Sequence, residues 1–260
     1  MPERGLQGTV SLVTGALGGI GRATCDALAQ AGSTVIGTDL AADPGDFAAG
    51  AYRRLDVTDE GGWRSIIEDV GRDHGRLDNL IQCAGVEMIA AIATTQPSEF
   101  RKCMDINVNG GFLGLQAAQP LLASSGARRK GGSSVIFLSS VGGLRGAPLM
   151  SAYCSSKGAV TLLAKSAAVE FGALDLPIRV NSVHPGCIDT GMMDRIYDHV
   201  VAEGAFPDEE AARSLYASRH PIGRMGDPEE VADAILFLCS SEASFMTGSE
   251  IVIDGGLTAG

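Results

Sequence analysis

A glycine-rich turn between a strand and a helix narrows the possible folds of this chain more than any other feature. Residues 9–13 (TVSLV) form a short β-branched and apolar run, and residues 20–31 have the spacing of an amphipathic helix. Between them, residues 14–21 read TGALGGIG, with glycines where the backbone must curl tightly or approach a ligand. A tight connection alone would also explain such a turn, but its place after the first strand favours a helix N-terminus that binds an anion.

Strands and helices then alternate along the chain. Apolar runs predict further strands at residues 34–38, 52–55, 80–82, 134–138, 179–184 and 250–253. Helical spacing predicts helices at residues 58–74, 97–122 and 151–171, with Thr58 as the expected cap of the first of these. The alternation predicts a single α/β domain over residues 1–260, Rossmann-type and doubly wound, in which about seven parallel strands are flanked by helices on both faces.

The composition argues against several classes of partner. The 260 residues include 31 acidic and 20 basic side chains, and the net charge of −11 would repel nucleic acid and anionic lipid surfaces. Six scattered cysteines form no CxxC pair and have no His at metal-ligand spacing, so we expect no metal site and a reducing compartment. The segment MPERGLQGTVSLVTG has no apolar run of signal-peptide length, and no stretch approaches a membrane span, so we expect a cytoplasmic protein.

The predicted strands end on residues suited to one shared binding site. In parallel α/β sheets, ligands bind beyond the carboxyl ends of the strands. That edge would collect the strand-end residues Gly15, Asp39, Asp56, Gly85, Ser140 and Pro185.

Asp39 follows the glycine-rich turn by about 20 residues, as the ribose-binding acid of a dinucleotide site does. Its carboxylate would accept hydrogen bonds from the ribose hydroxyls and would repel a 2′-phosphate, so we expect NAD(H) to be preferred over NADP(H). Leu40 and Gly18 supply no cation to offset this repulsion, and we interpret Arg22 as an exposed residue of the first helical turn. Asp56 is either a cap of the following helix or a contact of the adenine amino group.

Tyr153 and Lys157 are four residues apart on a predicted helix, so their side chains can converge on one point. A phenol with a pKa of about 10 is a poor base at neutral pH. An adjacent ammonium and a positively charged nicotinamide ring would both favour the phenolate, and we expect them to lower the pKa of Tyr153 by about 2 to 3 units. Such pairs also occur on ordinary helices, so the surrounding residues decide the interpretation.

Those surroundings carry a family pattern. The motifs TGALGGIG, LDV, CAG, MDINVNG, SS, YCSSK and HPGCIDT resemble, in order and spacing, the short-chain dehydrogenase/reductase family over nearly the whole chain. The resemblance implies hydride transfer between a nicotinamide cofactor and a secondary alcohol or ketone, with the tetrad Asn107, Ser140, Tyr153 and Lys157. In that family the tyrosine exchanges a proton with the substrate oxygen, which the serine hydrogen-bonds. The lysine also holds the nicotinamide ribose, and the asparagine anchors a water that relays protons.

The resemblance also implies how the chain divides its tasks. Residues 8–135 would form the cofactor-binding half, and residues 136–260 the catalytic and substrate-binding half. The backbone of Ile188 and the hydroxyl of Thr190 would contact the nicotinamide carboxamide. The full set of expected NAD contacts is Gly15, Leu17, Gly18, Gly19, Ile20, Gly21, Asp39, Leu40, Asp56, Val57, Cys83, Ala84, Gly85, Tyr153, Lys157, Pro185, Gly186, Ile188 and Thr190.

Neighbouring residues compete with members of the tetrad. Ser139 is a rival of Ser140 and Asn109 is a rival of Asn107, and in both cases the family offsets select the tetrad residue. His184 is interpreted as a packed neighbour of the cofactor loop rather than as an acid or a base.

The chain departs from the family pattern after the fourth strand, where Gln82-Cys83 stands in place of two asparagines. This substitution puts the cofactor contacts there in doubt. Cys83 could be a redox switch, but we interpret its thiol as a small, inert, buried group.

The segment from residue 191 to residue 224 is too long for a tight connection and predicts two lid helices over the substrate. Arg145 and Glu87 are expected to be solvated surface charges. The apolar residues expected to line a substrate pocket are Met192, Met193, Ile196, Tyr197, Val200, Val201, Phe206, Leu215 and Tyr216, together with Val86, Met88, Leu144, Leu149 and Met150.

This apolar pocket suggests a lipophilic, cyclic or steroid-like secondary alcohol, and the stretches IRVNSVHPG and TGMM are similar to bacterial hydroxysteroid and alicyclic alcohol dehydrogenases. A 3-oxoacyl-thioester reductase of the same family is an alternative, although it would usually require NADPH. A non-catalytic NAD-binding redox sensor is an alternative of another class. The family resemblance further implies a homotetramer that packs through the region of Phe112, the Tyr153 helix and the C-terminal segment around residues 254–256.

Overall fold

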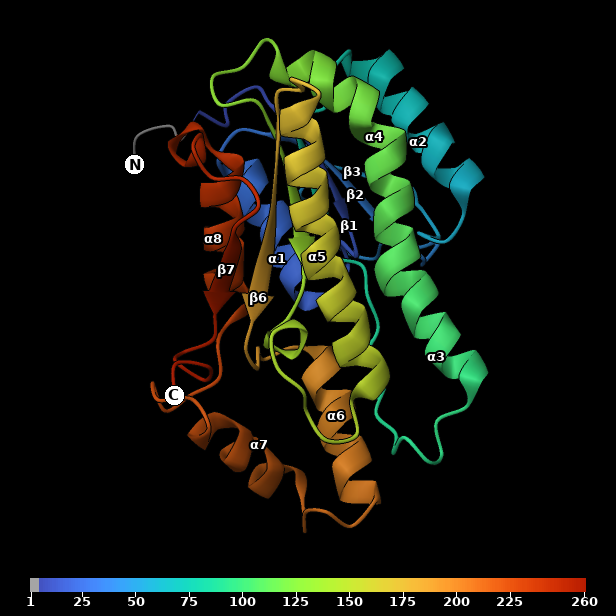
Figure 1. Ribbon diagram of the computed structural model, residues 1–260, viewed down its shortest axis with the longest axis vertical. Coiled ribbons are helices and arrows are strands. Elements are labelled where there is room, and N and C mark those ends of the chain that lie inside the picture. Colours follow the sequence, from blue (N-terminus) through green and yellow to red (C-terminus); the bar gives the residue numbers. More distant parts are fainter. Residues whose placement is uncertain (1–4) are drawn as a thin grey trace.

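The computed structural model describes residues 5–260, which form a seven-stranded sheet with layers of helices on both faces (Figure 1). All strand pairs are parallel, and the strand order is β3-β2-β1-β4-β5-β6-β7. This arrangement confirms the predicted fold class. The strands are β1 (Val10–Thr14), β2 (Thr34–Asp39), β3 (Ala51–Arg54), β4 (Asn79–Gln82), β5 (Ser133–Leu138), β6 (Ile178–Pro185) and β7 (Glu250–Ile253).

The helices are grouped by their position relative to the sheet. One face of the sheet is covered by α1 (Gly19–Gln30) and α8 (Pro228–Cys239), and the other by α2 (Glu60–His74), α4 (Gly110–Gly126) and α5 (Ser151–Ala173). A third group, α6 (Gly191–Ala202) and α7 (Glu209–Ser218), lies beyond the carboxyl ends of β6 and β7 (Figure 1). The remaining helix is α3 (Pro97–Met104), which runs through a π-helical turn (Asp105–Asn109) into α4.

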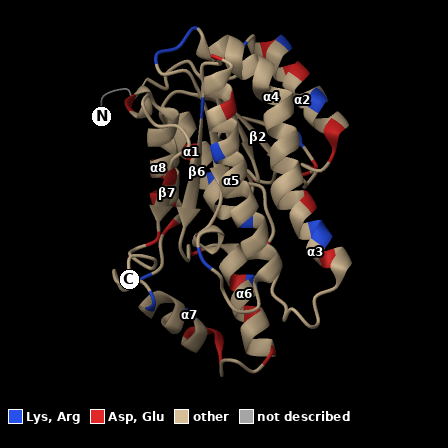
Figure 2. Ribbon diagram, viewed as in Figure 1, with Lys and Arg blue, Asp and Glu red and all other residues tan. Residues whose placement is uncertain are grey.

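Alternation along the strands divides the core into two layers. In β1, Leu12 packs in the layer that contains Trp63 of α2, whereas its neighbour Val13 packs in the layer that contains Leu28 of α1 and Ile235 of α8. All five side chains have no exposed surface. A strand that is buried on both faces needs apolar residues at successive positions, which is why β1 reads as a continuous apolar run. Charged residues lie mainly on the helices and loops (Figure 2).

Two local predictions need correction, and one helix was missed. Thr58 does not cap α2: the side chain of Asp59 accepts from the Gly61 amide, and Thr58 donates to Asp56 instead. The helix expected over residues 97–122 is interrupted by the π-helical turn and continues to Gly126. Helix α8 was not predicted, although its capping box at Asp227 and the following proline are local signals for a helix start.

Among the helices of residues 5–260, none combines the length and the apolar character that a membrane crossing requires. The prediction that the chain begins without a signal peptide falls partly on residues 1–4, which lie outside the described part of the chain.

Asp78 fixes the relative position of β1 and β4. Its carboxylate has no exposed surface and accepts hydrogen bonds from the Val10 amide at 2.8 Å and from two nitrogens of Arg76, both at 2.7 Å. Its own carbonyl accepts from the Ser134 amide at 2.9 Å, so the same residue also aligns β5. Because β1, β4 and β5 carry much of the binding edge, this contact supports the site from the far end of the sheet.

We expect Asp78→Ala to lower the free energy of unfolding by about 3 kcal/mol, because the buried Val10 amide loses its acceptor and Arg76 loses its partner. Urea denaturation followed by circular dichroism measures this change. Asp73→Ala is the matched control, since this exposed carboxylate pairs with Arg72 at the surface and should change stability by less than about 0.5 kcal/mol. Equal effects of the two substitutions would contradict the role given to Asp78.

Candidate active site

The carboxyl ends of the strands open into one large cleft of about 1440 Å³. This volume exceeds the range of roughly 300–1,000 Å³ typical of sites for one small ligand, so the cleft can hold a dinucleotide and a second molecule. Every residue that the sequence predicted to contact NAD lines this cleft, and Ser140 lines it too. Asn107 alone among the predicted site residues lies outside this lining, at a small neighbouring cavity behind the wall.

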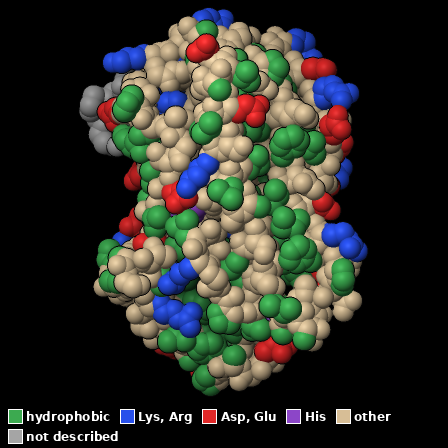
Figure 3. All heavy atoms as spheres, viewed as in Figure 1, with side chains coloured by type: hydrophobic (Ala, Val, Ile, Leu, Met, Phe, Trp, Pro, Cys, Tyr) green, Lys and Arg blue, Asp and Glu red, His purple; other side chains and the backbone are tan. Residues whose placement is uncertain are grey.

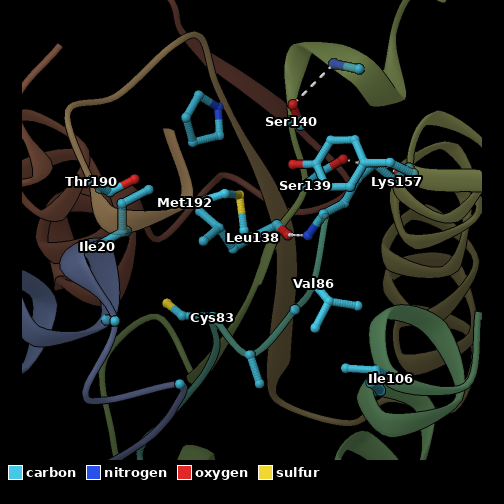
Figure 4. A pocket seen from close by; sticks show the side chains of 18 of the residues that line it. Ile20, Cys83, Val86, Ile106, Leu138, Ser139, Ser140, Lys157, Thr190 and Met192 are labelled. Atoms are coloured by element: carbon cyan, nitrogen blue, oxygen red, sulfur yellow. Dashed lines mark hydrogen bonds between the residues drawn. The ribbon is translucent and has the colours of Figure 1, made fainter. Parts of the chain in front are cut away.

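Three glycines of the glycine-rich turn, Gly15, Gly19 and Gly21, have no room for a side chain. Gly15 has a φ of +66°, and a Cβ on Gly21 would lie 2.0 Å from the Gly15 carbonyl oxygen. A Cβ on Gly19 would lie 2.6 Å from the Thr190 methyl group, so the turn and the loop after β6 are in close contact across the cleft. Figure 4 shows Ile20 and Thr190 together on one side, facing Ser140 and Lys157 on the other.

The N-terminus of α1 is suited to a bound anion. Gly18 is its N-cap, no side chain caps it, and its first turn contains no acidic residue. The first amides of a helix have no partner within the helix and carry a partial positive charge. In a chain with 31 acidic side chains, this uncapped end beside a cleft fits the pyrophosphate of a dinucleotide.

Asp39 ends β2 at the rim of the cleft. Its carboxylate accepts from the Leu17 amide at 3.1 Å and from the Leu40 amide at 2.7 Å, so it is held against the glycine-rich turn. Arg22 pairs with Asp46 at 2.8 Å and does not line the cleft. Asp56, the other acid at this end, accepts from the amide and the hydroxyl of Thr58, and these hydrogen bonds lower its pKa.

Tyr153 and Lys157 lie one turn apart on α5 and both reach the cleft, with the Lys157 nitrogen 5.7 Å from the centre of the Tyr153 ring. The Lys157 ammonium donates to the Leu138 carbonyl at the end of β5, at 2.7 Å (Figure 4). Burial lowers the pKa of Lys157 from 10.5 to about 8. Burial also raises the pKa of Tyr153 to about 12, and a hydrogen bond with Ser140 opposes this rise. The sequence predicted that the ammonium and a bound nicotinamide together lower this pKa; with the protein groups alone, burial raises it.

The two adjacent serines have different partners. Ser139 is buried, and its hydroxyl lies 3.0 Å from both the Lys157 carbonyl and the Thr161 hydroxyl within α5. Ser140 accepts from the Gly142 amide at 3.0 Å and points into the cleft (Figure 4). Tyr153 lines the same cleft. The hydroxyl of Ser139 is thus occupied in packing, and that of Ser140 is placed to meet a ligand.

His184 supports the Ser140 loop from behind. Its ring is fully buried on β6, and its Nδ1 lies 3.0 Å from the Ser140 carbonyl oxygen, to which it can only donate. Nε2 must then accept from the Ser182 hydroxyl at 2.8 Å, which assigns the tautomer of the neutral ring. Burial lowers the pKa of His184, so the ring stays neutral and serves packing.

Asn107 lies in the π-helical turn and is nearly buried. Its side-chain amide pairs with both backbone groups of Val86, at 2.8 and 3.0 Å, and donates to Ser156 on α5 at 2.9 Å. It therefore ties the loop after β4 to the helix that carries Tyr153. Its rival Asn109 instead donates to Asp105 at the surface.

The departure at Gln82-Cys83 has a structural role. Gln82 is buried and donates to the Gly111 carbonyl at 2.8 Å, which fastens β4 to α4. Burial raises the pKa of the Cys83 thiol to about 12, so this sulfur stays protonated and unreactive at neutral pH.

The pocket predicted from apolar residues is only partly present at the substrate end. Val86, Met150, Met192, Met193, Ile196 and Tyr216 line the cleft. Other predicted residues do not: Leu144 and Leu149 are exposed, and Tyr197, Val200 and Phe206 belong to a separate core between α6 and α7. Met88, Val201 and Leu215 also lie outside the cleft lining.

Glu87 is not the solvated surface charge that the sequence suggested. Only 13% of its side chain is exposed, and it forms a double ion pair with Arg195 of α6, at 2.5 and 3.0 Å. This contact joins the loop after β4 to the first of the two helices beyond the sheet. The sequence holds no signal for it, because the two residues are 108 positions apart.

Comparisons with known proteins agree with this geometry. A family model described as enoyl-(acyl carrier protein) reductase matches residues 15–258. The NADP-dependent (R)-specific alcohol dehydrogenase of Lentilactobacillus kefiri is 34% identical over 98% of this chain and 98% of its own length. The cyclopentanol dehydrogenase of Comamonas sp. is 38% identical over 96% of this chain and 97% of its own length.

A solved structure supports the same relationship. The ligand-free aldohexose dehydrogenase of Thermoplasma acidophilum has a TM-score of 0.90 and 34% identity, and the match covers 98% of this chain and 96% of that one. The glycine-rich turn, the strand order and the arrangement of Ser140, Tyr153 and Lys157 agree with these matches. The chain therefore belongs to the short-chain dehydrogenase/reductase family, whose members are nicotinamide-dependent oxidoreductases that act on CH–OH groups.

Proposed function

We propose that this oxidoreductase interconverts a lipophilic secondary alcohol and its ketone with NAD(H), and that Tyr153 transfers the proton. The observation that carries the proposal is the convergence of Tyr153, Ser140 and Lys157 on the cleft that the glycine-rich turn and Asp39 also line. A bound nicotinamide ring supplies the site that accepts or donates the hydride. The residues of the chain position the substrate oxygen and move its proton.

In this mechanism Ser140 and Tyr153 both hydrogen-bond the substrate oxygen. Because the pKa of the Tyr153 phenol is about 12, the phenol carries its proton at neutral pH and can donate it to the oxygen of a ketone. In the direction of alcohol oxidation the phenol must first lose that proton, and Lys157 is the adjacent cation that favours this loss. Asn107 positions these groups through Val86 and Ser156.

The preference for NAD(H) rests on Asp39. Its carboxylate lies at the turn that would receive the adenosine ribose, where a 2′-phosphate would bring two negative charges close to it. Arg22, the cation noted in the sequence, pairs with Asp46. Arg54 lies opposite Asp39 on β3 and donates to the Leu40 carbonyl at 3.1 Å. The relative from Lentilactobacillus kefiri is named as NADP-dependent, so the preference proposed for this chain rests on Asp39 and not on that relative.

The nature of the substrate follows from the apolar residues of the cleft. Val86, Met150, Met192 and Ile196 would surround a ring or an alkyl chain, and the Comamonas relative is named for a cyclic alcohol, cyclopentanol. A reductase of 3-oxoacyl thioesters is the second candidate, because the 3-oxoacyl-(acyl-carrier-protein) reductase of Thermotoga maritima is 36% identical over 97% of this chain and 98% of its own length. A non-catalytic NAD sensor would not need Ser140 and Tyr153 hydrogen-bonded in the cleft.

We also propose how the chain is organised and assembled. Residues 1–260 would act as one domain, with about 8–135 binding the cofactor, about 136–260 carrying the catalytic half, and 191–224 forming a lid of α6 and α7. A homotetramer would cover the outer face of α4 and α5, where Phe112, Leu162 and Val169 are 47, 67 and 74% exposed. Figure 3 shows hydrophobic side chains along this face.

Tyr153→Phe should lower kcat by at least about a hundredfold, because the variant loses the group that exchanges the proton. Its affinity for NADH, measured by the fluorescence of the reduced nicotinamide, should stay within about twofold of the wild type. Retained turnover would contradict the role of Tyr153. A wild type that binds NADH but turns over no alcohol or ketone would support the sensor instead.

The adjacent serines provide a matched pair of variants. Ser140→Ala should lower kcat by about 10²- to 10³-fold, as the loss of one hydrogen-bond donor to a reacting oxygen does. Ser139→Ala removes a hydroxyl that bonds within α5, so steady-state kinetics should show a kcat close to that of the wild type. The reverse ranking of the two variants would assign the catalytic hydroxyl to Ser139.

The cofactor proposal is tested by titrating NADH and NADPH separately. The wild type should bind NADH more tightly, and Asp39→Asn should reduce this discrimination by about tenfold, because it removes the charge but keeps an acceptor for the Leu17 amide. Asp73→Asn on α2 is the control for a general change in net charge. Tighter binding of NADPH by the wild type would refute the proposal and favour the acyl-thioester reductase.

Lys157 should make stability depend on pH in a defined direction. Between its folded pKa of about 8 and its ordinary value of 10.5, the unfolded chain binds more protons at this residue than the folded protein does. Wild-type stability should therefore rise relative to Lys157→Met across this pH range, by up to about 3 kcal/mol. Chemical denaturation of both proteins between pH 7.5 and 10.5 measures the difference between their free energies of unfolding. A difference that does not change with pH would contradict a lowered pKa of Lys157 in the folded protein.

A further inference from the structure

The charges that line the cleft are distributed unevenly. The acidic lining residues, Asp39, Asp56 and Asp105, lie on β2, after β3 and on the π-helical turn. The acidic Asp105 is accompanied by Arg101 and Lys102 of α3, which also line the cleft. The loop before α5, helix α6 and the C-cap of α7 contribute only basic charges to the lining, namely Arg145, Arg195 and Arg219. This is unexpected in a chain with a net charge of −11, and the three arginines lie on the elements that bound the substrate end.

One of the three charges is already balanced. Arg195 forms the double ion pair with Glu87, whose side chain is only 13% exposed. Arg145 and Arg219 have no carboxylate within 4.0 Å among residues 5–260. At the substrate end, the guanidinium groups of Arg145 and Arg219 therefore remain without an anionic partner on the wall of a mostly apolar cleft.

Both side chains are held in place by the fold. The Arg219 guanidinium stacks on the ring of Tyr216, 5.1 Å from its centre, and Tyr216 itself lines the cleft. The next residue, His220, is buried and accepts from the Cys187 amide at 3.2 Å, which fastens the end of α7 to the loop after β6. Arg145 donates to the carbonyl of Leu257, which also lines the cleft, at 3.3 Å.

The two arginines reach the surroundings of one loop. Arg145 contacts the C-terminal segment at Leu257, and Arg219 directly precedes His220, which accepts from the Cys187 amide. Cys187 follows Pro185-Gly186, at the place where the substrate would meet the cofactor. The positive charges of both arginines oppose the rise in the pKa of the Cys187 thiol that burial causes, in agreement with this placement.

We propose that the substrate end takes a secondary alcohol or ketone whose apolar ring or chain carries a carboxylate or a similar small anionic group, and that Arg145 and Arg219 bind this anion. The proposal rests on the proposed function and refines its substrate class. Apolar lining residues would hold the ring, and the paired guanidinium groups would select the charged end. A guanidinium fork matches a carboxylate better than a single ammonium does, which suits two arginines rather than lysines.

The test compares kcat/KM for three alcohols of equal ring size, which are cyclohexanol, 3-hydroxycyclohexanecarboxylate and the corresponding carboxamide. The wild type should favour the carboxylate over the carboxamide by at least about tenfold. Arg145→Gln and Arg219→Gln should each reduce this ratio by about fivefold, as expected for one charge contact near the surface. The ratio should also fall as the salt concentration rises.

Arg64→Gln is the matched control, because it removes one exposed arginine on α2, where Arg64 pairs with Glu60. It should leave the carboxylate-to-carboxamide ratio unchanged. A wild type that turns over the neutral alcohols without favouring the carboxylate would overturn this inference and leave the proposed function intact. No turnover of any of the three alcohols, nor of the matching ketones with NADH, would overturn the proposed function itself.

Discussion

The common direction of the seven strands is the constraint on which the rest of the structure depends. Because every strand pair is parallel, the carboxyl ends of all strands meet at one edge. This common direction alone places the glycine-rich turn after β1, Asp39 at the end of β2 and Leu138 at the end of β5 at the same edge of the sheet. Asp78 secures this arrangement from the opposite edge, since it holds β1, β4 and β5 in register.

Burial then decides the chemistry at that edge. The same loss of solvent lowers the pKa of Lys157 to about 8 and raises that of Tyr153 to about 12, so both groups are driven toward their neutral forms. The Leu138 carbonyl offers the ammonium its only direct hydrogen bond among the described residues. The phenol of Tyr153 therefore keeps its proton at neutral pH in the protein alone. Under the proposed function, the positive charge of an oxidised nicotinamide would favour loss of that proton.

Features that depend on local chemistry could be predicted from the sequence, and features that depend on distant contacts could not. The alternating apolar runs and the glycine spacing specify the strands, the turn and the edge at which the site lies. Thr58 and Asp59 are both good caps, so only the backbone geometry distinguishes them. Glu87 resembles any surface acid until α6 folds beside it and brings Arg195 within reach. Likewise, helical spacing in α6 and α7 indicates an apolar face, but Tyr197 and Val200 use that face to pack against α7 and not to line the cleft.

The charges at the two ends of the cleft have complementary effects on selectivity. In the proposed function Asp39 would disfavour a cofactor with an additional phosphate at the adenosine end, and Arg145 and Arg219 would favour a substrate with a negative charge at the substrate end. At physiological ionic strength the Debye length is about 8 Å, so each end acts on its own ligand with little influence from the other. The excess of acidic residues elsewhere would repel an anionic substrate from most of the surface. If the proposed substrate is correct, Arg145 and Arg219 would draw it toward the end of the cleft that Tyr153 lines.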